Sequence, residues 1–348
     1  MPEKLICKTP FSRGFNFSRW FEARSIEALR FNLCAKKDFE NVKSIGVDHI
    51  RVPIRVHDFV VDTNYTLNPQ LLTYFDHVVD WAEEVGLRLL LDNHTFNTLR
   101  PDSKNETLEF ALCKTWAQLA EHYKGCGDHL IFEVFNEPHG ITGEAWGAIQ
   151  GHVIEVIRAI DTVRTIIVGG VHYNSIEELN AIPAYPDKNL IYTFHYYDPH
   201  VFTHQGAPWD AIPLTSLKSM PFPWDSSRMP PLPDDLKGTY YEKVFAEYNV
   251  LSSRETMAAS LSEAVSFANK RQVPIFCGEF GVFMRNCLRE DRIRWHELTL
   301  ELFRERGIGW TIWDWYGDFG VFKKGEDRNF RTDLDPDIIK ALGLAMPA

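Results

Sequence analysis

The segment HLIFEVFNEPHG, residues 129–140, changes from apolar to polar within a few positions. Leu130 to Phe135 is largely apolar and aromatic, which is typical of a short strand buried on both faces in a parallel sheet. Asn136 and Glu137 follow at once, and Pro138 ends strand pairing because it has no N–H to donate. The segment therefore predicts a buried strand that presents an amide and a carboxylate at its carboxyl end.

A second segment, VPIFCGEFG at residues 273–281, has the same design. Its apolar run ends in a single carboxylate, Glu279, between Gly278 and Gly281. Cys277 lies inside this run, where a small buried hydrophobic residue is the expected role. Two predicted strands thus each deliver one glutamate to their carboxyl ends.

Strand and helix patterns alternate along the whole chain. The apolar periodicity predicts helices at about 36–44, 69–85, from 105 onward, 144–160, around 176 and 291–304. Asn68 and Pro69 are expected to start the second of these helices, and Gly86 to end it. The expected strands are Gly14–Phe17, Asp48–Ile54, Leu87–Asp92, Leu130–Phe135, Thr165–Val168, Leu190–Phe194, Val273–Glu279 and Ile308–Trp313. Eight strands with helices between them predict an α/β protein, a (β/α)8 TIM barrel formed by residues 1–348 as a single catalytic domain.

One long segment interrupts the alternation. Residues 199–233 contain eight prolines, so we expect an extended rim loop without regular structure. The alternative is a disordered linker between two domains. Phe202, Trp209, Phe222 and Trp224 argue against that alternative, because a solvated linker rarely keeps large aromatic residues.

Composition limits the partners. The 348 residues carry 48 acidic and 37 basic side chains, a net charge of −11, which disfavours nucleic acid as a partner and suits an uncharged substrate. We expect no membrane span and no signal-peptide core after Met1, so the protein is secreted or periplasmic with its leader absent, or cytoplasmic. The six cysteines have no C-x-x-C spacing; Cys113 and Cys126 remain a possible pair.

A barrel brings its eight strand ends to one face, where such folds carry their chemistry. Two carboxylates facing each other there suit glycoside hydrolysis, one as a protonated acid and the other as an ionised nucleophile or base. We expect Glu279, near Arg51 and Tyr197, to be kept ionised, and Glu137, near His195, to have the raised pKa of an acid/base. Asn136 is placed to donate to a sugar 2-hydroxyl.

Each candidate has a structural alternative. Arg51 could be an ion-pair partner within the barrel, and His94 and His195 could be hydrogen-bonded core residues. A metal site built from two histidines and two glutamates is disfavoured because H-E-x-x-H spacing is absent, so no metal and no cofactor are expected. Tryptophans at strand ends or in loops suit the apolar faces of sugar rings, although core packing is the alternative for each; Trp313 is the one that can be placed at the site.

In combination these motifs resemble glycoside hydrolase family 5, the retaining (β/α)8 cellulases and their relatives. They are Gly14-Phe15-Asn16, His49-Ile50-Arg51-Val52-Pro53, Asp92-Asn93-His94, Phe135-Asn136-Glu137-Pro138-His139-Gly140, His195-Tyr196-Tyr197, Gly278-Glu279-Phe280-Gly281 and Trp313. The resemblance covers about Gly14 to Phe322. It implies Glu137 as acid/base and Glu279 as nucleophile, with Trp313 as the stacking platform of the −1 sugar. The residues around that sugar would be Arg51, His94, Asn136, His195 and Tyr197, and Asn16 and Trp209 would be further substrate-binding residues. The segment Thr203-His204-Gln205-Gly206-Ala207 with Trp209 resembles a rim loop of bacterial endoglucanases in this family. The chain departs from the family pattern at two places. Asn93-His94 stands where some relatives have a His-His pair, and the proline-rich insertion from about Phe222 to Pro233 is longer than expected for the family.

The predicted function is that of a monomeric endo-β-1,4-glucanase that hydrolyses cellulose-type or mixed-linkage β-glucans by double displacement. A lichenase (β-1,3-1,4-glucanase), a mannanase or a xyloglucanase of the same family is the alternative. From another class, a catalytically silent glycan-binding barrel is disfavoured by the presence of both glutamates. A barrel isomerase or aldolase acting on phosphorylated sugars would need a glycine-rich phosphate loop after the seventh or eighth strand, where the chain has acidic and aromatic residues.

Overall fold

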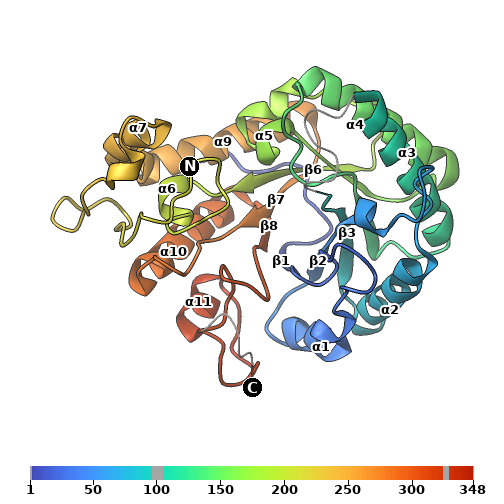
Figure 1. Ribbon diagram of the computed structural model, residues 1–348, viewed down its shortest axis with the longest axis horizontal. Helices are drawn as coiled ribbons and strands as arrows, with labels where there is room; N and C mark the ends of the chain where they lie inside the picture. The colour runs from blue at the N-terminus through green and yellow to red at the C-terminus, as the bar shows by residue number, and fades with distance from the viewer. Residues whose placement is uncertain (1, 96–104, 324–328, 348) are drawn as a thin grey trace.

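The eight parallel strands close into a barrel in sequence order, as the computed structural model shows for residues 2–95, 105–323 and 329–347 (Figure 1). Each strand pairs with the next, and β8 pairs with β1, which confirms the predicted (β/α)8 architecture. The strands are β1 (Arg13–Asn16), β2 (His49–Ile54), β3 (Arg88–Asn93), β4 (Leu130–Glu133), β5 (Ile166–Gly169), β6 (Leu190–Tyr196), β7 (Ile275–Phe280) and β8 (Gly309–Ile312).

Helices cover the outside of the barrel (Figure 1). They are α1 (Lys36–Ser44), α2 (Pro69–Val85), α3 (Asn105–Tyr123), α4 (Gly143–Ile160), α5 (Val171–Asn174), α6 (His200–Thr203), α7 (Tyr240–Ala246), α8 (Tyr248–Leu251), α9 (Arg254–Arg271), α10 (Arg289–Arg306) and α11 (Pro336–Ala341). Short 3-10 helices are η1 (Phe31–Leu33), η2 (Val56–Phe59), η3 (Glu177–Ala181) and η4 (Asp234–Leu236). None of the described helices is long and apolar enough to cross a membrane.

Local chemistry sets the ends of α2 as the sequence predicts. The Asn68 side chain accepts from the Gln70 N–H, Pro69 occupies the first turn, and Gly86 adopts a φ of 72° at the C-cap. The helix therefore begins and ends at residues whose own conformational preferences favour these positions.

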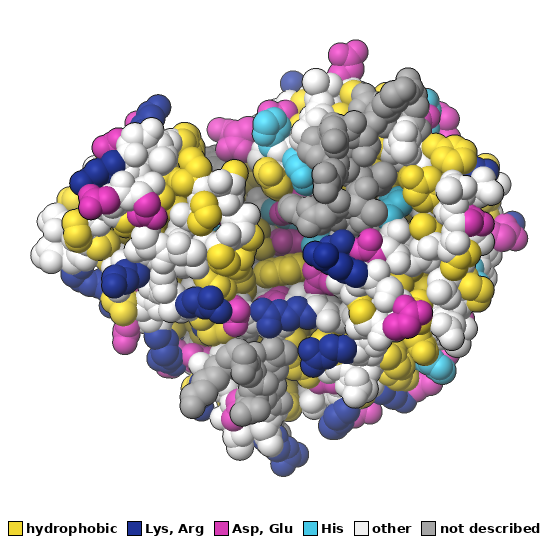
Figure 2. All heavy atoms as spheres, in the orientation of Figure 1, with side chains coloured by type: hydrophobic (Ala, Val, Ile, Leu, Met, Phe, Trp, Pro, Cys, Tyr) yellow, Lys and Arg dark blue, Asp and Glu magenta, His cyan; other side chains and the backbone are white. Residues whose placement is uncertain are grey.

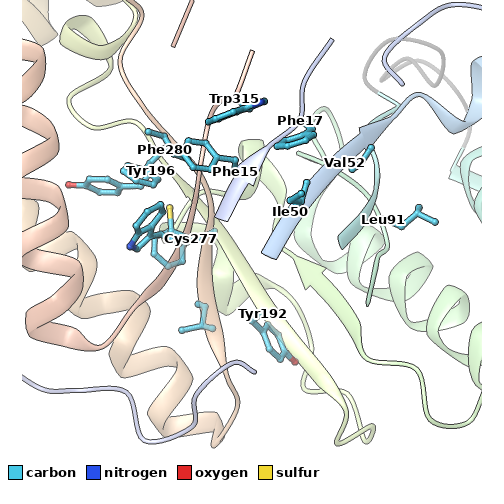
Figure 3. Packing of buried hydrophobic residues seen from close by; sticks show 14 of the residues in the cluster. Phe15, Phe17, Ile50, Val52, Leu91, Tyr192, Tyr196, Cys277, Phe280 and Trp315 are labelled. Atoms are coloured by element: carbon cyan, nitrogen blue, oxygen red, sulfur yellow. The ribbon is translucent and has the colours of Figure 1, made fainter. Parts of the chain in front are cut away.

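The outer faces of the strands form the main core with the helices. Figure 3 shows Phe15 of β1, Ile50 of β2 and Phe280 of β7 among its side chains. Cys277 is fully buried in the same cluster, and none of the six cysteines, Cys113 and Cys126 included, is in a disulfide. Cys277 thus has the expected role of a small apolar residue.

Inside the barrel, an apolar layer gives way to a polar one. Leu90 and Ile131 belong to a small buried cluster that is separate from the main core. Because side chains on one face of a strand recur every second residue, Asp92 and Glu133 follow them on the inner face, toward the carboxyl ends. The barrel interior therefore presents buried carboxylates directly beneath the face formed by the carboxyl ends of the strands.

The rim lobe, which we define as residues 199–253, projects from the barrel with α7 at its edge (Figure 1). It packs as part of the fold: the Tyr248 hydroxyl donates to the Pro221 carbonyl at 2.6 Å, and Phe202 and Phe222 are buried against each other. The expectation that residues 199–233 lack regular structure is wrong at one place, because α6 forms within them. Proline does not prevent this turn, since Pro199 lies at the N-cap, where no helical N–H is needed.

Candidate active site

A cleft of about 1030 Å³ opens at the carboxyl ends of the strands. Figure 2 shows the hollow at the centre of this face, with hydrophobic and acidic side chains on its floor. Seven of the ten predicted site residues line the cleft: His94, Glu137, His195, Tyr197, Trp209, Glu279 and Trp313. The other three, Asn16, Arg51 and Asn136, are buried and connected to these by hydrogen bonds.

Arg51 connects three of the predicted residues. Its side chain is fully buried, and Nη1 donates to Glu279 Oε1 and Asn16 Oδ1, both at 2.8 Å. Nη2 donates to Asn136 Oδ1, also at 2.8 Å. One guanidinium thus fixes side chains from β1, β7 and the end of β4.

Two further partners of Arg51 were missed from the sequence. Glu133 accepts two hydrogen bonds, from Nε at 2.7 Å and Nη2 at 2.9 Å, and an Asp92 oxygen lies 3.0 Å from Nη2. A charged residue inside an otherwise apolar strand has to be paired, and this signal was available at both positions. Arg51 is therefore an ion-pair partner within the barrel, which was the alternative to a role at the site, and it is also a direct neighbour of Glu279.

Glu279 receives hydrogen bonds on both oxygens. Arg51 donates to Oε1, and the Tyr197 hydroxyl donates to Oε2 at 3.0 Å. Burial and the nearby carboxylate raise the pKa of Tyr197 well above its ordinary range, so the phenol keeps its proton. Burial also raises the pKa of Glu279, while the positive charge of Arg51 acts to lower it. That these donors keep Glu279 ionised stays a prediction.

Glu137 occupies a different environment. It follows β4 with a φ of 41°, a conformation that L-residues rarely adopt and that is often found at functional sites. Its Oε1 lies 2.7 Å from Nδ1 of His195. Burial raises the pKa of Glu137 to about 7, although His94 and Arg51 act to lower it. This carboxyl is therefore protonated over much of the range below neutral pH.

His195 is held as a neutral ring. Burial lowers its pKa to about 4. The amide of Asn174, a residue without a recognisable sequence signal, donates to Nε2 at 3.4 Å, and this assigns the ring proton to Nδ1, facing Glu137. Gly278 leaves room for the ring, since a Cβ there would lie 2.6 Å from Thr193 Oγ1 and 3.2 Å from His195 Nε2.

The two glutamates converge as predicted. The nearest side-chain donor atoms of Glu137, His195 and Glu279 all lie within 4.8 Å of one another. The carboxylates come from β4 and β7, which are not neighbours in the barrel. Only closure of the barrel brings them to the same place.

Aromatic side chains form a wall of the cleft. Trp313 stacks on His94 with ring centroids 5.4 Å apart and planes 15° from parallel. Trp209 is 54% exposed and packs edge-on against Phe283 at 4.9 Å. In contrast, Trp20 and Trp315 are fully buried in the core. Trp313 therefore lines the cleft as the sequence predicts, and Trp209 of the rim lobe lines it as well.

Among the residues that the structure describes, Glu137, His195 and Glu279 are the one group that can supply three metal ligands. They come from separate strands, so no sequence spacing could have revealed them. The Arg51 guanidinium donates to Glu279 at 2.8 Å, and its positive charge would repel a divalent cation placed there. The arrangement favours carboxylate chemistry over metal binding.

Comparison with known proteins shows which family this arrangement belongs to. A family model described as "Cellulase (glycosyl hydrolase family 5)" matches residues 10–318. The chain belongs to glycosyl hydrolase family 5. This confirms the resemblance suggested by the sequence motifs and makes the protein a glycoside hydrolase.

Family 5 relatives match along most of the chain. Endoglucanase C from Acetivibrio thermocellus is 29% identical over 330 residues, which cover 91% of this chain and 94% of that protein. Cellodextrinase A from Ruminococcus flavefaciens is 27% identical over 311 residues, 85% of this chain and 83% of the relative.

Solved structures share the whole fold. The crystal structure of endoglucanase Cel5A from Thermotoga maritima has a TM-score of 0.79 at 26% identity and covers 95% of this chain and 96% of that one. A complex of the same enzyme with mannotriose has a TM-score of 0.79 at 26% identity, with 95% and 97% covered.

Proposed function

We propose that this family 5 hydrolase is an endo-β-1,4-glucanase that cleaves cellulose-type or mixed-linkage β-glucans with retention of configuration. The spacing of Glu137 and Glu279, with donor atoms within 4.8 Å, is the observation that carries the proposal. Retaining glycosidases have carboxyl groups about 5–5.5 Å apart, whereas inverting enzymes need about 6.5–9.5 Å to admit a water. The short separation of Glu137 and Glu279 suits direct attack of one carboxylate on the sugar.

In the first step, Glu279 attacks the anomeric carbon and forms a glycosyl ester as the glycosidic bond breaks. Glu137 transfers its proton to the departing oxygen, so the leaving group departs as an alcohol. Tyr197 and Arg51 hold the attacking carboxylate in one orientation through hydrogen bonds at 3.0 and 2.8 Å. The pKa of about 7 suits Glu137 to its role as the acid.

In the second step, the ionised Glu137 takes a proton from water, and the resulting nucleophile attacks the same carbon and releases Glu279. His195 is neutral and lies 2.7 Å from Glu137, and it donates to the Glu137 carboxylate while the glycosyl ester exists. Asn136 is fixed through its oxygen by Arg51, and its Nδ2 lies 3.4 Å from Nε2 of His94, which leaves a second amide hydrogen for a sugar 2-hydroxyl. Trp313 supplies the apolar surface under the reacting ring.

The preferred linkage rests on relatives. A structural neighbour titled as a hyperthermophilic endo-β-1,4-glucanase in complex with substrate is 26% identical, with a TM-score of 0.79, and the curated relatives above are named endoglucanase and cellodextrinase. A mannanase is the second candidate, because a neighbour of the same fold was solved with mannotriose as substrate. Lichenase and xyloglucanase are the remaining candidate activities within the family.

Because a polymeric glucan does not cross membranes, we infer that the protein meets its substrate outside the cytoplasm. We also expect the protein to be a monomer. Cell fractionation and size-exclusion chromatography test both expectations. A cytoplasmic or oligomeric protein would contradict them.

The deciding experiment follows product stereochemistry and azide rescue. We expect proton NMR to show the β-anomer first from cellopentaose. Glu137→Ala should lower kcat by ~10²–10⁴-fold, and Glu279→Ala by more. Azide should restore turnover in both, giving the inverted glycosyl azide with Glu279→Ala and the retained one with Glu137→Ala. An α-anomer as first product, or near wild-type turnover by Glu279→Ala on barley glucan, would refute the mechanism.

A further inference from the structure

The cleft extends beyond the two glutamates in two directions. At one end it is lined by Ser18, Arg19 and Glu22 after β1; at the other by Tyr173 after β5 and Asp210 of the rim lobe. The second end adjoins the proposed acid. The Tyr173 N–H donates to the Pro138 carbonyl at 3.3 Å, immediately after Glu137 in the chain.

This position sets the direction of the substrate. The acid protonates the oxygen that leaves with the departing sugars, so those sugars lie on the side of the acid. The Tyr173 ring is stacked on His139, with centroids 4.8 Å apart and planes 13° from parallel. The departing part of a glucan therefore runs past Tyr173 toward the rim lobe.

Tyr240, the first residue of α7, lines the cleft at this far end. Its side chain is 71% exposed, the largest exposure among the five exposed large aromatic residues in the described part of the chain. Three of those five, Tyr173, Trp209 and Tyr240, line the cleft, which is a concentration of open ring surface along one groove.

The neighbours of Tyr240 hold it in place. Thr239 caps α7 by accepting from the Tyr241 N–H at 3.2 Å, and the Tyr241 hydroxyl donates to Asp210 Oδ2 at 3.1 Å. His200 Nε2 lies 2.8 Å from the same oxygen, which joins α6, the loop at 210 and α7. Because Tyr241 is held by these contacts, the backbone of the adjacent Tyr240 is kept at the edge of the cleft.

We propose that Tyr240 forms a distal sugar-binding site for the departing part of the substrate, beyond the sugar next to the scissile bond. The ligand is a neutral pyranose unit of the same β-glucan chain, whose apolar C–H face stacks on the phenol ring. This inference rests on the proposed glucanase function. It assigns the rim lobe a role in selecting long substrates over short ones.

The test compares a long and a short substrate. Cellohexaose reaches past the first departing sugar, whereas the nitrophenyl group of p-nitrophenyl β-cellobioside fills only the first departing position. In Tyr240→Ala we expect the ratio of kcat/KM for cellohexaose to that for the nitrophenyl substrate to fall ~3- to 10-fold. Tyr240→Trp should keep the ratio at or above the wild-type value.

Phe110→Ala is the matched control, because Phe110 is an exposed aromatic residue of α3 that does not line the cleft. Its ratio should equal that of the wild type. An unchanged ratio in Tyr240→Ala, or an equal fall in Phe110→Ala, would make Tyr240 an ordinary surface tyrosine and overturn the inference. If the unmodified protein cleaves neither substrate, the proposed function itself fails, and this inference with it.

Discussion

Glu137 and Glu279 are the same side chain in two environments. Glu279 receives Arg51 on one oxygen and the Tyr197 hydroxyl on the other. Glu137 contacts the neutral ring of His195 and is largely shielded from water, so burial dominates and raises its pKa to about 7. Such a difference between paired carboxyl groups is what separates an acid from a nucleophile.

The raised pKa of Glu137 predicts a pH profile. Because the acid must carry its proton, kcat/KM should fall above about pH 7, by roughly tenfold per pH unit, in steady-state assays with cellopentaose. Glu137→Gln cannot titrate, so on 2,4-dinitrophenyl β-cellobioside, whose leaving group needs no proton, its basic limb near pH 7 should be absent. Persistence of that limb in Glu137→Gln would assign it to another group.

At the scale of elements, the rim lobe depends on a few polar contacts between short helices. Asp210 accepts from Tyr241 of α7 and lies within hydrogen-bonding distance of His200 of α6. The Arg228 side chain is paired with Asp291 of α10, which ties the lobe to the barrel. The lobe thus has a defined position without a large core of its own.

Removing Asp210 should therefore loosen the lip of the cleft. We expect Asp210→Ala to raise KM for cellohexaose ~3- to 10-fold, because α7 loses its contact with α6 and no longer holds Tyr240 in place. Limited proteolysis should also cut the lobe faster. Asp225→Ala, which removes two local hydrogen bonds donated by Ser227 in the same lobe, is the control. Equal effects of the two substitutions would argue against a specific role of Asp210.

At the scale of the whole molecule, two carboxyl groups link stability to pH in opposite directions. Burial acts to raise the pKa of Asp48, but hydrogen bonds from His49 and Ser12 outweigh it and lower that pKa well below the ordinary range. Asp48 therefore stabilises the fold above about pH 3.9, its unfolded value, and this stabilisation is lost as the pH falls. Glu137 acts oppositely, because its folded pKa lies above its unfolded one.

As the pH rises, Glu137 loses its proton at a lower pH in the unfolded chain than in the folded protein. The free energy of unfolding should therefore fall between about pH 4.5 and 7. A rise from 4.5 to about 7 corresponds to ~3 kcal/mol. Urea unfolding should show Glu137→Gln more stable than the wild type by up to ~3 kcal/mol at about pH 8, with little difference at about pH 4. The same difference at both pH values would rule out this linkage.

The local sequence pattern predicts the strands and the residues at their carboxyl ends. Leu130–Phe135 and Val273–Glu279 have local patterns that predict buried strands with glutamates at their carboxyl ends, and barrel closure follows from eight such units. The observed strands differ from the expected ones by a residue or two at their ends, where pairing with neighbours decides the boundary. The helical turn α6, within residues 199–233, was not predicted because it depends on tertiary contacts.

Arg51 shows what the sequence by itself could not supply. Local pattern determined the barrel, the position of Glu137 and Glu279 at one face, and Arg51 as a buried cation, because side-chain periodicity and strand ends are properties of neighbouring residues. Its pairing with Glu133 and Asp92, the contact of Asn174 with His195 and the position of Tyr240 over the cleft were decided only by the tertiary structure. Each depends on distances between separate strands or helices, which are set when the barrel closes and the rim lobe packs against it.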